Sequence, residues 1–219
     1  MFIMDEFDLY EQKLNLIFDS RGGLEDYHDR DWAIYLLAGA LIGNRKDNNL
    51  STEEVCNFLD IVLNHNFNFV YNKTVKFNDC LSKKIQQHPV FTDKLGKFLL
   101  QFKLVNVQLG PGEFFITFFD TSTTIGIGPG LDYDIRREIN GKKERIENKS
   151  AATNYIKIEQ VEKIKKERDS ILVAKVPNDQ NSKTNFSRSE YRMCKVENID
   201  EQFNYDGEGL RFKNGKKIN

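Results

Sequence analysis

The chain has 219 residues, of which 32 are Lys or Arg and 33 are Asp or Glu, and its formal net charge is −1. This length permits one domain, or one domain with a sizeable appendage, and it is enough to bury a core without covalent staples. The near-neutral balance excludes a basic surface over the whole chain, so any surface for nucleic acid has to be local.

The cysteines and the apolar segments indicate in which cellular compartment the protein is expected. Cys56, Cys80 and Cys194 lie far apart and lack the paired spacing of a zinc site, which fits a reducing environment. No apolar run reaches the length of a membrane span, and the N-terminal segment is acidic where a signal peptide would be basic. We therefore expect a soluble, cytoplasmic protein that does not bind membranes.

The first half of the chain has the apolar spacing of helices. The predicted helices cover residues 6–18, 24–43, 53–64, 76–87 and 91–102. Ser51 and Glu54 form a capping box ahead of the third helix, and Pro89 separates the last two. In the second helix we expect four core side chains, Trp32, Tyr35, Leu36 and Leu37. Residues 1–105 are thus predicted to form a helical region that recognises a substrate or mediates oligomerisation.

The second half alternates between strand and helix patterns. The apolar run at residues 114–119 is compatible with either, and the Pro and Gly ahead of it, with Glu113 in its first turn, favour a helix. A loop rich in Thr and Gly follows at residues 121–130. Beyond a hairpin, we predict a charged helix at 156–168, a central strand at 171–176 and a weaker strand at 191–196. Residues 106–219 are predicted to be an α/β core, with a small mixed sheet flanked by helices and a polar tail.

Asn140-Gly141 is the strongest short hairpin signal in the chain. A two-residue turn pairs the residues that flank it, and the count along both strands places Ile135 opposite Ile146. Because strand side chains alternate between faces, both isoleucines point toward the core. Their neighbours Asp134 and Glu147 then face each other on the other side of the hairpin.

Two facing carboxylates are unfavourable unless positive charge compensates them. Continuing the count places Asp132 opposite Lys149, on the same face as Asp134 and Glu147. Hard oxygen ligands of this kind suit Mg²⁺ or Mn²⁺, and a neighbouring ammonium can orient water or stabilise charge on a phosphate. Two acids, a lysine and a metal are sufficient for hydrolysis of a phosphodiester.

Asp134, the hairpin and the triplet Glu147-Asn148-Lys149 together resemble the motif of the PD-(D/E)xK nuclease superfamily, which has the restriction-endonuclease-like fold. That fold runs helix, three-stranded meander, helix and strand, and the elements predicted for residues 106–177 follow this order. The resemblance implies that Asp134, Glu147 and Lys149 are catalytic and that both acids bind Mg²⁺ or Mn²⁺. It departs from the family pattern in two places: Pro129 is displaced from the first acid, and the middle residue of the triplet is polar.

The resemblance also extends the site beyond the hairpin. It implies Glu113, on the preceding helix, as a further metal ligand, and Asp132 competes with Asp134 for the same ion. Gln160 and Lys163, on the following helix, are candidates to approach the scissile phosphate. The expected function is a Mg²⁺-dependent deoxyribonuclease, favoured as an endonuclease, in restriction, defence, phage or repair processes. Its partner is DNA, and a homodimer is compatible with this function.

Each of these residues also has a purely structural explanation. Charges along the hairpin are typical of a solvated edge, although they account less well for an Asp facing a Glu. Glu113 could simply favour the positive end of a helix, and Lys163 could belong to a salt-bridged helix face. The alternative function is a catalytically silent module of the same fold, which binds nucleic acid or another protein.

Overall fold

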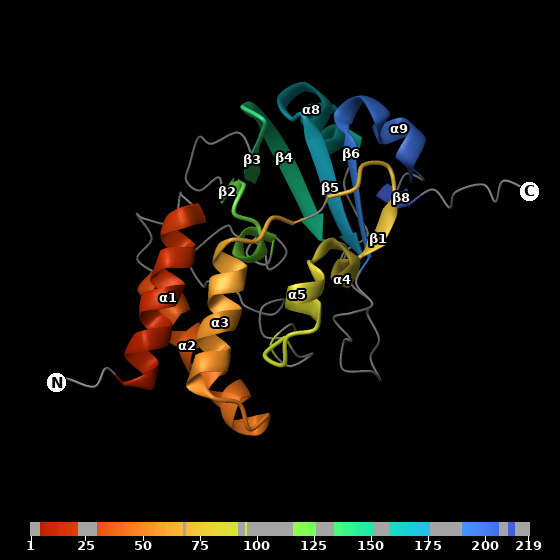
Figure 1. Cartoon of the computed structure of the whole chain (residues 1–219). Coiled ribbons are helices and arrows are strands. Elements are labelled where there is room, and N and C mark those ends of the chain that lie inside the picture. The colour runs from red at the N-terminus through yellow and green to blue at the C-terminus, as the bar shows by residue number, and fades with distance from the viewer. Residues whose placement is uncertain are drawn as a thin grey trace, which may run out of the picture.

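The computed structural model describes residues 5–21, 30–67, 69–91, 95, 116–125, 134–150, 158–175, 190–205 and 210–212. Three helices form the N-terminal region: α1 (Glu6–Arg21), α2 (Arg30–Asp47) and α3 (Thr52–Leu63). They stand side by side at the left of Figure 1, with β2 beside the end of α1. The predicted capping box is confirmed, because Ser51 Oγ accepts from the Glu54 amide and the Glu54 carboxylate accepts from the Ser51 amide.

The segment predicted as one helix over residues 76–87 contains two short helices and part of a strand. Strand β1 (Thr74–Lys76) leads into α4 (Phe77–Cys80), and α5 (Lys83–Gln86) follows after a break. Ser82 lies in this break and caps α5, because its side chain accepts from the Ile85 amide at 3.4 Å. Of the helix predicted at residues 91–102, only residues 91 and 95 are described, and the first residues of the helix predicted at 24–43 lie outside the described part.

The described residues form a mixed sheet of six strands in the order β1-β6-β5-β4-β3-β2, in which β1 comes from the first half of the chain and the other five strands from the second half. Its other strands are β2 (Thr123–Ile125), β3 (Ile135–Ile139), β4 (Lys142–Ser150), β5 (Ser170–Lys175) and β6 (Glu190–Lys195). Strands β4 and β5 are parallel and joined through helix α8 (Ile158–Glu167), whereas every other neighbouring pair in this sheet is antiparallel. The chain is therefore an α/β protein, in which a helical region precedes a mixed sheet flanked by helices.

The C-terminal part adds small elements that the sequence did not predict. A 3₁₀ turn, η2 (Val196–Asn198), leads into helix α9 (Ile199–Gln202), and β7 (Phe203–Tyr205) pairs with β8 (Leu210–Phe212) as a separate two-stranded sheet. Strand β2 is also new, since it lies inside the segment expected to be a loop. Strands of three residues carry too little alternation to be recognised from sequence.

The two faces of the large sheet pack against different helices. Ile135, Ile146 and Leu172 belong to the large hydrophobic cluster that also contains the buried residues of α1–α3. Ile171 and Val173, which alternate with Leu172 along β5, belong to a second cluster with residues of α8 and α9. The sheet is thus a middle layer between two sets of helices, as the placement of α8 and α9 in Figure 1 also indicates.

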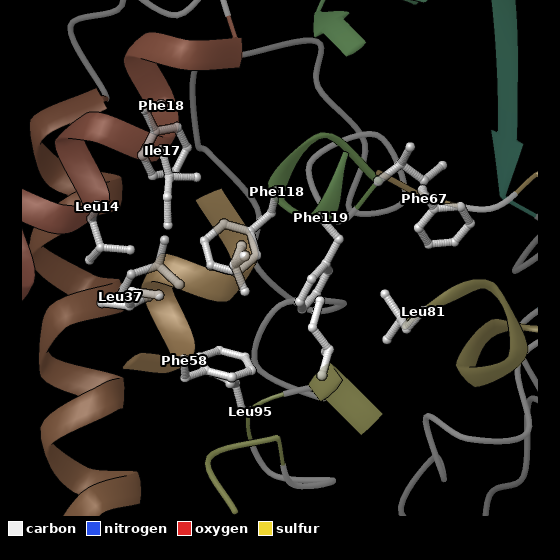
Figure 2. Close-up of a cluster of buried hydrophobic side chains, with 14 of the residues drawn as sticks. Leu14, Ile17, Phe18, Leu37, Phe58, Phe67, Leu81, Leu95, Phe118 and Phe119 are labelled. Atoms are coloured by element: carbon white, nitrogen blue, oxygen red, sulfur yellow. The ribbon is translucent and has the colours of Figure 1, made fainter. Parts of the chain in front are cut away.

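Residues 116–119 join the helical region to the sheet. They are helical, as predicted for this apolar run, and Ile116, Phe118 and Phe119 are buried. Figure 2 shows Phe118 among the side chains of α1, α2 and α3, while Phe119 lies toward Leu81. The Phe118 ring lies 6.5 Å from that of Phe18, and the Phe119 ring lies 6.4 Å from that of Phe77. One short helix therefore connects both parts of the core.

The prediction of core residues in the second helix is wrong for two of the four side chains. Leu37 is buried and Leu36 is partly buried, but Trp32 is 54% exposed and Tyr35 is 52% exposed. Helix α2 buries the stripe that contains Ala33, Ile34 and Leu37, and the two aromatic residues lie beside this stripe. Among the described residues, no helix combines the length and the apolar character needed to cross a membrane.

Candidate functional site

The hairpin that carries the predicted site has the predicted register. Asn140 and Gly141 have positive φ angles of 52° and 75°, the conformation of a type I′ turn. Ile139 pairs with Lys142 at the turn, and Ile135 pairs with Ile146 at the far end of β3. This turn matches the twist of the strands it connects, so the local sequence alone fixes which residues of β3 and β4 face each other.

Asp134 lies directly before β3 and reaches across to β4. Its Oδ2 accepts a hydrogen bond of 2.9 Å from the backbone amide of Asn148. Asn148 follows Glu147 in the chain, so the Asp134 carboxylate lies at the same level of the hairpin as Glu147. The structure therefore brings these two predicted acids to the same end of the hairpin.

Glu147 is a buried carboxylate on the face of the sheet that packs against α8. It pairs in register with Ile171, a member of the second hydrophobic cluster, and is only 8% exposed. Its Oε2 accepts a hydrogen bond of 2.8 Å from Nε of Arg168, the residue that follows α8. The sequence predicts a metal cation as the compensating charge for the two acids; in the structure, a backbone amide donates to Asp134 and an arginine donates to Glu147.

The other predicted site residues are only partly described. Lys149 belongs to β4 and pairs in register with Val173, but its side chain lies outside the described part, as does that of Gln160. Glu113 and Asp132 also lie outside the described residues. Lys163 is exposed on α8 and forms an ion pair of 3.7 Å with Glu167, which is the salt-bridged helix face considered as the structural alternative. Its approach to a phosphate stays a prediction.

Within the described part of the chain, no group of three or more His, Cys, Asp or Glu side chains is placed to hold a metal ion. Of the four predicted ligands, Glu113 and Asp132 lie outside this described part. Asp134 and Glu147 are thus the two members of the predicted set whose placement is known.

A buried polar cluster that the sequence did not predict lies where the helical region meets the sheet. Asp120 is fully buried; its Oδ1 accepts from the amide and hydroxyl of Ser122, and its Oδ2 lies 3.5 Å from Nε of Arg137. Arg137 also donates to the Phe67 carbonyl at 2.9 Å and lies over the Phe69 ring. Burial raises the pKa of Asp120, and the Arg137 charge opposes this rise.

Two further residues complete this cluster from the helical side. Arg21, at the end of α1, is 1% exposed and donates to the Val62 carbonyl at 2.9 Å. Burial and, to a smaller extent, the Arg21 charge lower the pKa of His65 to about 4. Arg21 Nε, His65 Nε2 and Asp120 Oδ2 are buried without a hydrogen-bond partner among the described residues. The cluster is therefore only partly satisfied, which makes its stability sensitive to protonation.

A second polar cluster centres on the buried residue Glu144. Glu144 lies two residues before Ile146 in β4, on the same face of the strand. The Tyr71 hydroxyl lies 2.7 Å from both carboxylate oxygens, Lys195 Nζ lies 2.6 Å from Oε1, and the Ser170 hydroxyl donates to Oε1. These hydrogen bonds lower the pKa of Glu144 against the opposing effect of burial. The cluster joins three strands and the segment before β1, and all its charged groups are paired.

The chain was also compared with protein-family models, with curated proteins and with solved structures, and none of them matches it. The resemblance to the PD-(D/E)xK superfamily therefore depends on the residues and the order of elements described above.

Proposed function

We propose that the protein is a metal-dependent nuclease that hydrolyses phosphodiester bonds in DNA. The observation that carries the proposal is the hairpin, whose register brings Asp134 and Glu147 to one end of neighbouring strands. The order of elements adds support, because the antiparallel strands β2, β3 and β4 are followed by α8 and then by β5, parallel to β4. This is the order of the fold that the motif implies.

The donor groups fit the metal that this function requires. Asp134 and Glu147 offer carboxylate oxygens, which Mg²⁺ and Mn²⁺ prefer over nitrogen or sulfur ligands. Glu113 and Asp132 are proposed as additional ligands, and Lys149 is proposed to orient the attacking water or to stabilise negative charge on the phosphate. A bound divalent cation would supply a more acidic water and neutralise charge on the phosphate. The three free cysteines fit the proposed cytoplasmic location.

The test is cleavage of plasmid and single-stranded DNA with Mg²⁺ or Mn²⁺ by the wild type and by Asp134→Asn, Glu147→Gln and Lys149→Ala. We expect each change to lower the cleavage rate by about a hundredfold or more, because each removes a charge-bearing group from the reaction. Glu138→Gln and Lys143→Ala are matched controls, since both residues are exposed and pair with each other near the turn of the same hairpin.

The controls are expected to cleave like the wild type. Equal cleavage by all six proteins would mean that the activity comes from a contaminant, and cleavage by none would contradict the nuclease proposal. The pattern of products, nicked, linear or degraded, would distinguish an endonuclease from an exonuclease.

A protein-interaction module of the same fold is the second candidate, and one observation favours it. The rings of Trp32 and Tyr35 stack on the surface of α2 with centroids 5.5 Å apart, although both residues are more than half exposed. Exposed aromatic pairs are enriched at protein interfaces. If this surface pairs two copies of the chain, the variant Trp32→Ser/Tyr35→Ser will sediment as a smaller species than the wild type. Val70→Ser, an exposed apolar residue elsewhere, is the control.

A further inference from the structure

The contact between Arg168 and Glu147 bears on how the proposed site would take up its metal. Nε of Arg168 lies 2.8 Å from Oε2 of Glu147, and the two side chains are only 10% and 11% exposed. An ion pair this well shielded from water is stronger than a pair on the surface. A divalent cation that binds Glu147 therefore has to displace the Arg168 guanidinium or bind beside its positive charge.

The backbone keeps Arg168 in place. Its amide donates to the Ile164 carbonyl at 2.9 Å, which continues the hydrogen bonding of α8 by one residue. The next residue, Asp169, is bound to β4 in both directions: its amide donates to the Arg145 carbonyl at 2.9 Å, and its Oδ2 accepts from the Arg145 amide at 2.8 Å. Arg168 thus projects from a fixed junction between α8 and β5, close to β4.

A second anion lies within reach of the same guanidinium. Nη1 of Arg168 is 3.5 Å from Oε2 of Glu167, and it also lies 3.3 Å from the Glu167 carbonyl oxygen. The Glu167 side chain is 41% exposed, so it offers the guanidinium a partner that is open to water. Releasing Glu147 would therefore not leave the arginine as a buried unpaired charge, which would be very costly.

From these contacts we infer that Arg168 competes with the divalent cation for Glu147 and so sets the metal concentration at which the site fills. The inference depends on the proposed function, because it takes Glu147 as a metal ligand. It assigns Arg168 a regulatory role, in which the guanidinium moves from Glu147 toward Glu167 when the metal binds.

The test is Mn²⁺ binding to the full chain, measured by electron paramagnetic resonance of the free ion, without any DNA or turnover. We expect Arg168→Gln to bind Mn²⁺ at least about fivefold more tightly than the wild type, the lower end of usual coupling between two ligands. Arg168→Lys keeps the charge but not the planar guanidinium, so its affinity should lie between the two.

The matched control is Arg145→Gln. Arg145 lies two residues before Glu147 on the same face of β4, and its Nε pairs with Asp169 at 3.2 Å. This change removes the same charge from the same face of β4 and leaves both Arg168 and Glu147 unaltered, so we expect the Mn²⁺ affinity to stay close to that of the wild type. An equal gain in both variants would overturn the inference, because it would show only the general effect of net charge.

Glu147→Gln separates failure of the inference from failure of the proposed function. If Glu147→Gln abolishes Mn²⁺ binding and the two Arg168 variants bind like the wild type, Arg168 does not compete and the metal site remains. If no protein binds Mn²⁺ through Glu147, both the inference and the metal site are overturned. Thermal unfolding of each variant shows whether it is folded, and Arg168→Lys provides the comparison if Arg168→Gln is not.

Discussion

Two buried arginines connect segments that are far apart in the sequence. Arg21 Nη2 donates to the carbonyls of Val62 and Phe118, which belong to two different segments, and Arg137 bonds the Phe67 carbonyl from the sheet. Burial, partly opposed by the charge of Asp120, lowers the pKa of Arg21 to about 10, so the guanidinium still carries its charge at neutral pH. Each such charge requires partners in distant parts of the chain, and this requirement fixes how those parts are arranged.

Arg137→Met is expected to destabilise the protein by about 3–5 kcal/mol, because it leaves the Asp120 carboxylate buried beside fewer positive charges. Arg136→Met is the matched control, since Arg136 is the neighbouring residue on the opposite face of β3 and is less buried. Urea unfolding of both variants measures the difference. Equal losses would show that the Asp120 pair contributes little to stability.

Tyr191, which is buried, and Tyr71, which is partly buried, make an opposite pair of predictions. The Tyr191 hydroxyl is buried and has no hydrogen-bond partner among the described residues, whereas the Tyr71 hydroxyl lies 2.7 Å from the Glu144 carboxylate. Tyr191→Phe should therefore leave the unfolding free energy unchanged or raise it by about 1 kcal/mol. Tyr71→Phe should lower it by about 1.5–3 kcal/mol, since it removes a bond to a charged group. Chemical denaturation of the two variants side by side tests both predictions. A lower unfolding free energy for Tyr191→Phe would indicate that the Tyr191 hydroxyl has a hydrogen-bond partner.

At the scale of elements, the turn of the β3–β4 hairpin determines the register. Gly141 has φ of 75°, and nothing lies within 4 Å of a Cβ placed on it, so the cost of Gly141→Ala comes from the backbone alone. We expect this change to lower the unfolding free energy by about 1 kcal/mol. Gly39→Ala is the control, and its expected effect has the opposite sign. A Cβ placed on Gly39 also has no atom within 4 Å, but Gly39 lies inside α2, where alanine is more favourable than glycine by about 1 kcal/mol. Thermal unfolding distinguishes the two, and a loss of stability in both would contradict the argument from φ.

The same local signals explain which elements the sequence could predict. The Asn140-Gly141 turn, the Ser51 capping box and the apolar β5 each carry their information within a few residues, and the structure confirms all three. Strands β1 and β2 have three residues each and are held by pairing with β6 and β3, which no local pattern reveals. The prediction that Trp32 and Tyr35 belong to the core is wrong for a related reason. Their apolar character does not show whether they lie within the buried stripe of α2 or beside it.

The candidate site divides in the same way. The pairing of Asp134 with the Glu147 region follows from counting along one hairpin, so the sequence could predict it. Arg168 reaches Glu147 only because β5 is parallel to β4 and α8 ends beside it, which requires the folded sheet. The Arg21 and Asp120 cluster was beyond prediction as well, since Arg21 bonds the Phe118 carbonyl 97 residues away.

On the scale of the whole molecule, the buried titratable groups make stability depend on pH. Burial, helped by the Arg21 charge, lowers the pKa of His65 from 6.5 to about 4 in the folded protein. As the pH falls from 6.5 toward 4, the unfolded chain binds a proton at His65 that the folded protein does not bind, so the unfolding free energy decreases. The pKa of Glu144 is also lowered, and its contribution is lost as the pH falls below its usual range. Asp120 acts in the opposite direction, because its pKa is raised and its contribution is lost as the pH rises.

His65→Gln isolates the histidine part of this dependence. Between about pH 6.5 and pH 4 the wild type should lose on the order of 1–3 kcal/mol through His65, and the variant should lose that much less. His88, whose pKa is also lowered by burial, stays in the variant and leaves a smaller slope in the same direction. Urea unfolding at several pH values across this window measures both proteins. Equal losses in wild type and variant would show that His65 takes up its proton in the folded state as readily as in the unfolded chain, and would leave His88 and the Glu144 cluster as the sources of the acid sensitivity.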